Sequence, residues 1–205
     1  MPASVAVRVI GSGPAVMLVH GEVGPGPTWK AQEELSSRWR LVMVTRRGFR
    51  PSPAADRQDF AADARDIEKL LGREPAHCVG CGYGAVGLAV AAGRAPDRFR
   101  SLTLIEPPPL GPPPVSPPPE AESSGHVRPA SEAEPDLAAV AGAGLPALVL
   151  SGAHHPGLEE ACDALAAGLG AERERLPGAD HAVQRTPEFN RRLERFLFAA
   201  ESGRR

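Results

Sequence analysis

The strongest constraint in this sequence is a regular alternation of short apolar runs with longer stretches of helical periodicity. Apolar runs predict strands at 15–20, 41–45, 76–79, 101–105 and 147–151, and a further strand is expected at 172–176. Helices are predicted at 28–39, 59–71, 83–94, 136–143, 157–169 and 187–200. Strands that alternate with helices form βαβ units around a mostly parallel sheet covered on both faces. We therefore expect an α/β protein with a three-layer α/β/α sandwich.

The first strands need a separate prediction. Residues 4–10 alternate apolar and polar side chains, which predicts an additional strand, and the turn Gly11-Ser12-Gly13-Pro14 leads directly into the run 15–20. This pattern predicts a hairpin. Thr28 is the expected N-cap of the helix that follows.

Length and charge exclude several classes of protein. With 205 residues we expect one domain over 1–205, and 23 Lys+Arg against 25 Asp+Glu argue against a nucleic-acid or membrane-surface partner. No run reaches the roughly 18 apolar residues of a membrane span, and no signal peptide is evident. We expect a cytoplasmic protein with three reduced cysteines, and the sequence does not fix its oligomeric state.

In parallel sheets of this kind, ligands bind beyond the carboxyl ends of the strands. The residues that follow the predicted strands are therefore the candidates for function. They are His20-Gly21-Glu22, Thr45-Arg46-Arg47, Gly80 to Gly84, Glu106, Gly152 to Pro156, and His181.

Four of these segments together resemble the α/β-hydrolase superfamily. They are His20-Gly21, Arg46-Arg47-Gly48-Phe49, Gly80-Cys81-Gly82-Tyr83-Gly84, and His181 followed by a helix. Each segment is weak evidence alone, but the four occur in the family's order and spacing, over about Val5 to Phe198. The resemblance implies the α/β-hydrolase fold and a chemistry related to ester hydrolysis.

The family's nucleophile is the residue that this chain lacks. In relatives, a sharp strand-to-helix turn carries Ser, Cys or Asp between flanking glycines. Here the flanks are Gly80 and Gly84, and the central residue is Gly82. Glycine has no atom that can attack a carbonyl, so we do not expect the usual acyl-enzyme route. Cys81 is an alternative nucleophile, although its position one residue earlier points its side chain elsewhere. Cys78 and Cys81 also form a CxxC motif, and a redox dithiol is a further alternative.

The other catalytic positions of the resembling family are only partly filled. His181 stands where relatives keep their catalytic histidine, but no carboxylate occurs at 152–156, where the usual acid would lie. Glu106, one strand earlier, is an alternative acid that would orient His181. The alternatives are that His181 only caps or packs and that Glu106 is a solvated charge. The backbone amides of Tyr83 and of Glu22 or Val23, after Gly21, are the expected oxyanion donors.

Two other kinds of site are less favoured. Gly82 to Gly87 reads GxGxxG between a strand and a helix, with Glu106 closing the next strand, which outlines a dinucleotide-binding loop. Such a loop usually opens its domain, and it explains neither His20-Gly21 nor His181. The positions of His126, His154 and His155 are too irregular to predict a metal site. We expect neither a metal nor a cofactor.

Proline accumulates where relatives insert a helical lid. Nine of the 23 prolines lie between Glu106 and Pro119. Proline lacks an amide donor and fixes φ, so this stretch favours polyproline II over a helix. We expect a flexible loop over 107–135 in place of the lid, and hence an open cleft; a ligand for an aromatic groove on a partner is the alternative.

Two functional hypotheses follow. The first is a degenerate hydrolase that has lost its nucleophile and binds a small molecule or a partner. The second is an enzyme without a covalent intermediate, in which His181, with Glu106, acts as general base in hydrolysis, lyase or isomerase chemistry.

Overall fold

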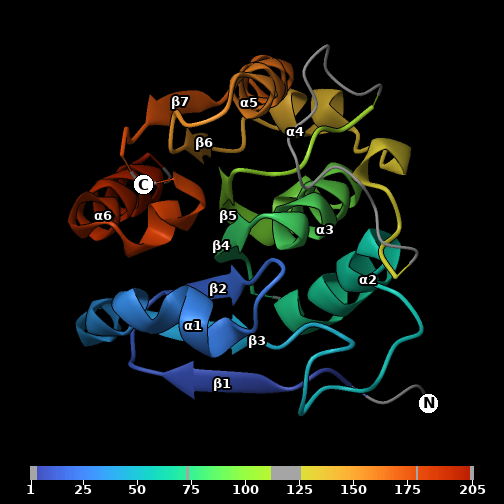
Figure 1. Ribbon diagram of the computed structural model, residues 1–205. Helices are drawn as coiled ribbons and strands as arrows, with labels where there is room; N and C mark the ends of the chain where they lie inside the picture. Colours follow the sequence, from blue (N-terminus) through green and yellow to red (C-terminus); the bar gives the residue numbers. More distant parts are fainter. Residues whose placement is uncertain (1–3, 73, 112–125, 179, 204–205) are drawn as a thin grey trace.

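A seven-stranded sheet forms the centre of the molecule, in the order β1-β3-β2-β4-β5-β6-β7 (Figure 1). The computed structural model describes residues 4–72, 74–111, 126–178 and 180–203. The strands are β1 (Val7–Ile10), β2 (Ala15–Val19), β3 (Arg40–Val44), β4 (Ala76–Cys81), β5 (Phe99–Ile105), β6 (Ala147–Ser151) and β7 (Glu172–Arg175). Only β1 is antiparallel to its neighbour, and the other pairs are parallel. The predicted mostly parallel sheet is confirmed.

Helices cover both faces of this sheet, as a three-layer sandwich requires (Figure 1). They are α1 (Pro25–Trp29), α2 (Phe60–Leu71), α3 (Tyr83–Arg94), α4 (Leu137–Gly142), α5 (Pro156–Leu169) and α6 (Pro187–Ser202), with short 3-10 helices η1 (Lys30–Ser37), η2 (Pro96–Arg98), η4 (Ala130–Glu132) and η5 (Asp180–Arg185). One apolar cluster joins the sheet to α2, α3, α4 and α5, and a second joins its other face to α1, η1 and α6. The two clusters are the two interfaces of the sandwich.

The α3 helix is apolar on all sides, because it is the most buried helix. Its residues from Tyr83 to Gly93 are all buried, and small side chains let it lie against both the sheet and α2. By contrast, α2 has one apolar face, and Asp59 caps it by accepting a hydrogen bond from the Ala61 N–H at 2.8 Å.

The predicted hairpin at the N-terminus is wrong. Strand β1 pairs antiparallel with β3, and β2 lies on the other side of β3, so that β1 and β2 are not neighbours. The turn Gly11 to Pro14 therefore carries the chain across an intervening strand. Gly11 and Gly13 both have positive φ there, and an added Cβ at either would lie 2.4 Å from a backbone oxygen of the segment before β3.

The helix predicted for 28–39 also differs from the structure. The chain begins its α-helix earlier, at Pro25, and turns into the 3-10 helix η1 after Trp29. Thr28 is not an N-cap; its hydroxyl donates a hydrogen bond to the Gly24 carbonyl at 2.9 Å, inside the first turn. Proline at the first helical position explains the earlier start, because its missing N–H is not needed there.

The segment that follows β5 is only partly described. Residues 112–125, most of the proline-rich stretch, lie outside the described residues. Over 126–135 the segment is not a free loop: Arg128 N–H donates to the Gln58 carbonyl, Tyr83 Oη donates to the Arg128 carbonyl at 2.7 Å, and Ala130 and Ala133 are buried. Among the residues that the structure describes, no helical cap stands between β5 and α4.

The described helices include none with both the length and the apolar character needed to cross a lipid bilayer.

The close approach of α3 to the end of β2 generates a stability prediction. An added Cβ at Gly84 would lie 2.2 Å from the His20 carbonyl oxygen, whereas one at Gly142, also helical, meets nothing within 4 Å. We expect Gly84→Ala to lower the free energy of unfolding by at least about 1–3 kcal/mol, because backbone must move. Urea unfolding measures this, with Gly142→Ala as the control. Equal stabilities of the two variants would contradict the proposed close packing.

Candidate functional site

The carboxyl ends of the six parallel strands meet at one edge of the sheet, and the predicted site residues gather there. At the centre, β4 ends at Cys81, Gly82 makes the turn with φ of 53° and ψ of −129°, and α3 begins at Tyr83. Positive φ favours glycine, because any side chain in this conformation adds strain to the backbone. The residue between strand and helix is therefore Gly82, which carries no side chain.

The carboxylate of Glu22 fills the space beside this turn. Its Oε1 accepts a hydrogen bond from the Tyr83 N–H at 3.0 Å. A Cβ built on Gly82 would lie 2.5 Å from Glu22 Oε2 and 2.9 Å from Oε1. Glu22 thus comes from the β2 loop and reaches the first amide of α3, one of the two amides expected to bind an oxyanion.

The β2 loop itself is held by Arg46, which is buried. Its Nε lies 2.8 Å from Asp63 Oδ2 in α2, and its Nη1 donates to the Gly21 carbonyl at 2.8 Å. Its guanidinium also stands 5.0 Å from the centre of the Tyr83 ring. His20 completes this contact, because its Nε2 accepts the Arg46 N–H at 3.0 Å. His20 and Gly21 therefore shape the loop, while Val23 beyond it is exposed.

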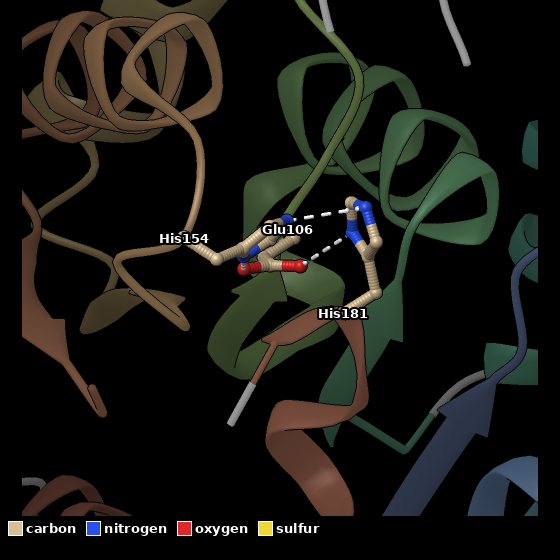
Figure 2. Close-up of side chains that lie close together, drawn as sticks. All are labelled: Glu106, His154 and His181. Carbon is tan, nitrogen blue, oxygen red and sulfur yellow. Dashed lines mark hydrogen bonds and ion pairs between the residues drawn. The ribbon is translucent and has the colours of Figure 1, made fainter. Parts of the chain in front are cut away.

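His181 and Glu106 meet across the edge of the sheet, as the alternative acid position predicts (Figure 2). His181 Nδ1 lies 3.1 Å from Glu106 Oε2. Glu106 follows β5, and His181 lies in η5 after β7. The carboxylate is buried, and its Oε1 accepts the Gly152 N–H at 2.6 Å. Burial raises the pKa of Glu106, while the Gly152 hydrogen bond and the two nearby imidazoles lower it.

A third side chain, which the sequence did not link to this pair, lies beside it. His154, in the loop after β6, places its Nε2 3.1 Å from His181 Nε2 (Figure 2). Both ring nitrogens of His181 therefore have neighbours, and its Nε2 faces another imidazole. No spacing in the sequence reveals this, because residues 106, 154 and 181 come together only when three parallel strands align.

Cys81 and Cys78 lie inside the fold. Both thiols are buried, and Cys81 Sγ faces the Gln184 side chain at 3.8 Å. Burial raises the pKa of the Cys81 thiol, and the charges of Glu22 and Glu106 act in the same direction. A thiol that stays protonated is a poor nucleophile, so this placement weighs against both the thiol-dependent hydrolase and the redox dithiol.

The geometry also weighs against a dinucleotide at Gly82 to Gly87. In such loops the N-terminus of the helix binds the pyrophosphate. Here the Glu22 carboxylate already accepts the Tyr83 N–H, and it would repel a phosphate. The glycines have packing roles instead: an added Cβ on Gly87 would lie 2.8 Å from the Asp63 Cβ of α2.

Comparison with known proteins places these features in a family. Residues 14–129, more than half of the chain, match a family model described as the alpha/beta hydrolase fold. This range contains the His20 loop, the β4–α3 turn and Glu106.

Curated relatives match a similar part of the chain. It is 31% identical over 105 residues to 2-(acetamidomethylene)succinate hydrolase from Mesorhizobium japonicum, covering 49% of this chain and 38% of that protein. It is 34% identical over 107 residues to pimeloyl-[acyl-carrier protein] methyl ester esterase from Chromobacterium violaceum, covering 50% of this chain and 41% of that protein. The matched stretch thus spans about two fifths of the length of these relatives.

Solved structures extend the likeness to nearly the whole chain. A carboxylesterase structure from Nitrososphaera gargenis has a TM-score of 0.77 at 13% identity and covers 99% of this chain and 98% of its own. An esterase from Thermogutta terrifontis has a TM-score of 0.71 at 20% identity, covering 98% of this chain and 93% of its own. At these identities the likeness establishes the fold.

The buried His20 generates a pH prediction. Burial, with the nearby charge of Arg46, lowers its pKa from 6.5 to about 4. His20 stays neutral in the folded protein and is protonated more readily in the unfolded chain. The contribution of neutral His20 to the free energy of unfolding is therefore complete above pH 6.5 and is lost as pH falls toward 4. We expect the protonation of His20 to lower the free energy of unfolding by about 2–3 kcal/mol between about pH 7.5 and pH 4.5.

Urea unfolding at the two pH values measures this effect as a difference between the wild type and His20→Gln. Glutamine retains an acceptor for the Arg46 N–H but does not titrate. The same pH dependence in both proteins would contradict a neutral, buried His20.

Proposed function

The chain belongs to the alpha/beta hydrolase fold family, and we propose that within it this protein has lost covalent catalysis and binds a small acyl compound or a partner. The observation that carries the proposal is the Glu22 carboxylate beside Gly82. Acyl transfer through a covalent intermediate needs a nucleophile at the turn and free amides beside it. In this chain the turn residue Gly82 has no nucleophile, and one of the two amides, that of Tyr83, already donates to Glu22.

The position of Glu22 supports the proposal that the loss of covalent catalysis involves residue 22 as well as residue 82. Any side chain at residue 82 would have to displace the carboxylate, since the space for its Cβ overlaps both carboxylate oxygens. The displaced carboxylate would give up the Tyr83 N–H. Positive φ at residue 82 adds strain to every substitution there. Glycine at 82 and glutamate at 22 therefore suit one another.

The charge of Glu22 supports the same conclusion. An oxyanion hole stabilises negative charge that develops on a carbonyl oxygen. The Tyr83 amide instead donates to a group that already carries a negative charge. A second negative charge beside the Glu22 carboxylate is disfavoured. The space next to the Tyr83 amide therefore suits a neutral carbonyl better than a tetrahedral oxyanion. The relatives named as hydrolase and esterase suggest the class of ligand: a small ester or amide of a carboxylic acid.

A second candidate function is general-base catalysis without a covalent intermediate. The contact of 3.1 Å between His181 Nδ1 and Glu106 Oε2 favours it, because a carboxylate in that place fixes the tautomer of an imidazole base. The other ring nitrogen of His181, Nε2, faces His154. For His181 to act as a base on a substrate, His154 would have to turn aside or accept the proton.

Esterase kinetics test the main proposal. We expect p-nitrophenyl butyrate to raise the melting temperature of the protein while giving no burst of p-nitrophenol and no acyl adduct by intact-mass analysis, because binding survives and the nucleophile does not. An acyl adduct on the wild-type chain would contradict the proposal. Steady turnover without an adduct that disappears in His181→Ala would contradict the main proposal and place the reaction at His181 instead.

A double variant tests the role assigned to Glu22. We expect Gly82→Ser alone to gain little esterase activity, and Gly82→Ser with Glu22→Ala to exceed it by about 10²–10³-fold, the effect of one oxyanion donor. The pair Gly82→Ser with Glu22→Gln is the matched control, because glutamine keeps the size of the side chain without its charge. Equal activity in all three would show that Glu22 does not block the turn.

A further inference from the structure

The two adjacent histidines after β6 have different environments. His154 is only 18% exposed and packs its ring edge-on against His181, with ring centres 4.0 Å apart. His155 is used by the helix that follows: its Nδ1 accepts the Gly157 N–H at 3.2 Å at the start of α5. The chain thus turns one histidine toward Glu106 and His181 and uses the next as a helix cap.

Two neutral histidines do not have enough N–H groups to make a hydrogen bond at every close contact among Glu106, His154 and His181. Each neutral imidazole carries a single N–H, so the contact between the two Nε2 atoms uses the proton of one ring. That ring then presents a bare Nδ1 to the carboxylate. The distances are 3.1 Å from His181 Nδ1 to Glu106 Oε2 and 3.3 Å from His154 Nδ1 to Oε1. In either arrangement one lone pair faces an anionic oxygen at short range.

The environment of His154 Nδ1 agrees with this. It is buried and has no hydrogen-bond partner, although an oxygen of Glu106 lies nearby. Buried nitrogens without partners are uncommon in folded proteins, and where they occur a bound ion or water often satisfies them. A cation held among the three side chains would satisfy this nitrogen and offset the buried charge of Glu106.

The spacing of the donors suits a metal ion. Glu106, His154 and His181 each offer one ligand atom, and these atoms lie within 4.8 Å of one another. Ligand atoms bound to one Zn²⁺ at about 2.0–2.2 Å are about 3.3–3.6 Å apart. The bound of 4.8 Å is wider than this spacing, so metal binding would draw the three side chains closer together. His181 is 46% exposed, which leaves room for water as a further ligand.

The backbone is strained at three positions in or next to the cluster. Three described non-glycine residues have positive φ: Glu106 at 43°, Ala153 at 56° and Asp180 at 46°. One is a member of the cluster, and each of the others precedes one of its histidines. Strained residues that gather in this way are typical of sites where side chains are held for binding.

We propose that Glu106, His154 and His181 bind a divalent transition-metal ion of the Zn²⁺ class. Two imidazoles and one carboxylate are donors that Zn²⁺ and its neighbours in the periodic table prefer, whereas Mg²⁺ and Ca²⁺ prefer oxygen alone. Such an ion lowers the pKa of a bound water, which would supply a nucleophile that does not depend on residue 82. The proposal is independent of ester binding, because the three residues alone define it.

Metal titration tests the site without reference to activity. We expect tag-free, metal-stripped protein to bind one Zn²⁺ per chain by isothermal titration calorimetry, and Co²⁺ to give a visible absorption band that Zn²⁺ displaces. His154→Ala and His181→Ala should each weaken binding by at least about 10–100-fold, because loss of even a partner of a ligand has that effect.

His155→Ser is the matched control, since it removes the neighbouring imidazole and keeps a side chain that caps α5. It should bind Zn²⁺ as the wild type does, and circular dichroism checks that all variants are folded. Binding that is absent in the wild type, or unchanged in His154→Ala, would overturn the proposal; the first result would mean that a proton alone satisfies the cluster. If His181→Ala does not fold, His154→Ala decides the question.

Discussion

The buried guanidinium of Arg46 holds together the parts of the molecule that define the site. It contacts α2 through Asp63, the β2 loop through the Gly21 carbonyl, and the start of α3 through the Tyr83 ring. Breaking a buried ion pair of this kind costs about 3–5 kcal/mol, because it leaves an unpaired charge in the interior. The position of Glu22, one residue beyond Gly21, depends on this anchor. The shape of the turn at Gly82 and the group that fills it therefore share one support.

Much of the fold could be predicted from the sequence, because periodicity reflects burial. The helix over 83–94 and the strand over 147–151 were predicted with the bounds that the structure has, since glycine, proline or charged residues end each apolar run. The pairing of β1 could not be predicted. Alternating side chains show that a strand has one buried face but do not identify its neighbour, and β1 bypasses β2 to reach β3.

The candidate site was predictable only where residues follow strands. The pairing of Glu106 with His181 follows from topology, since parallel strands end at one edge. His154 lies in the candidate segment Gly152 to Pro156, but its contact with His181 was missed, because the sequence does not tell which of the adjacent histidines turns toward the pair. The backbone amide of Glu22 was named as a possible oxyanion donor, but the contact of its side chain with the Tyr83 amide was not predicted, because it depends on how the loop after β2 is folded.

The contact between Glu22 and α3 also has a consequence for stability. The first turn of a helix is the positive end of its macrodipole, and a carboxylate placed there stabilises the helix by about 0.3–1 kcal/mol. In a catalytic relative, that positive end would help to stabilise the transition state. Here it stabilises the folded ground state through Glu22. The Tyr83 amide at the start of α3 therefore contributes to the stability of the fold through its hydrogen bond to Glu22.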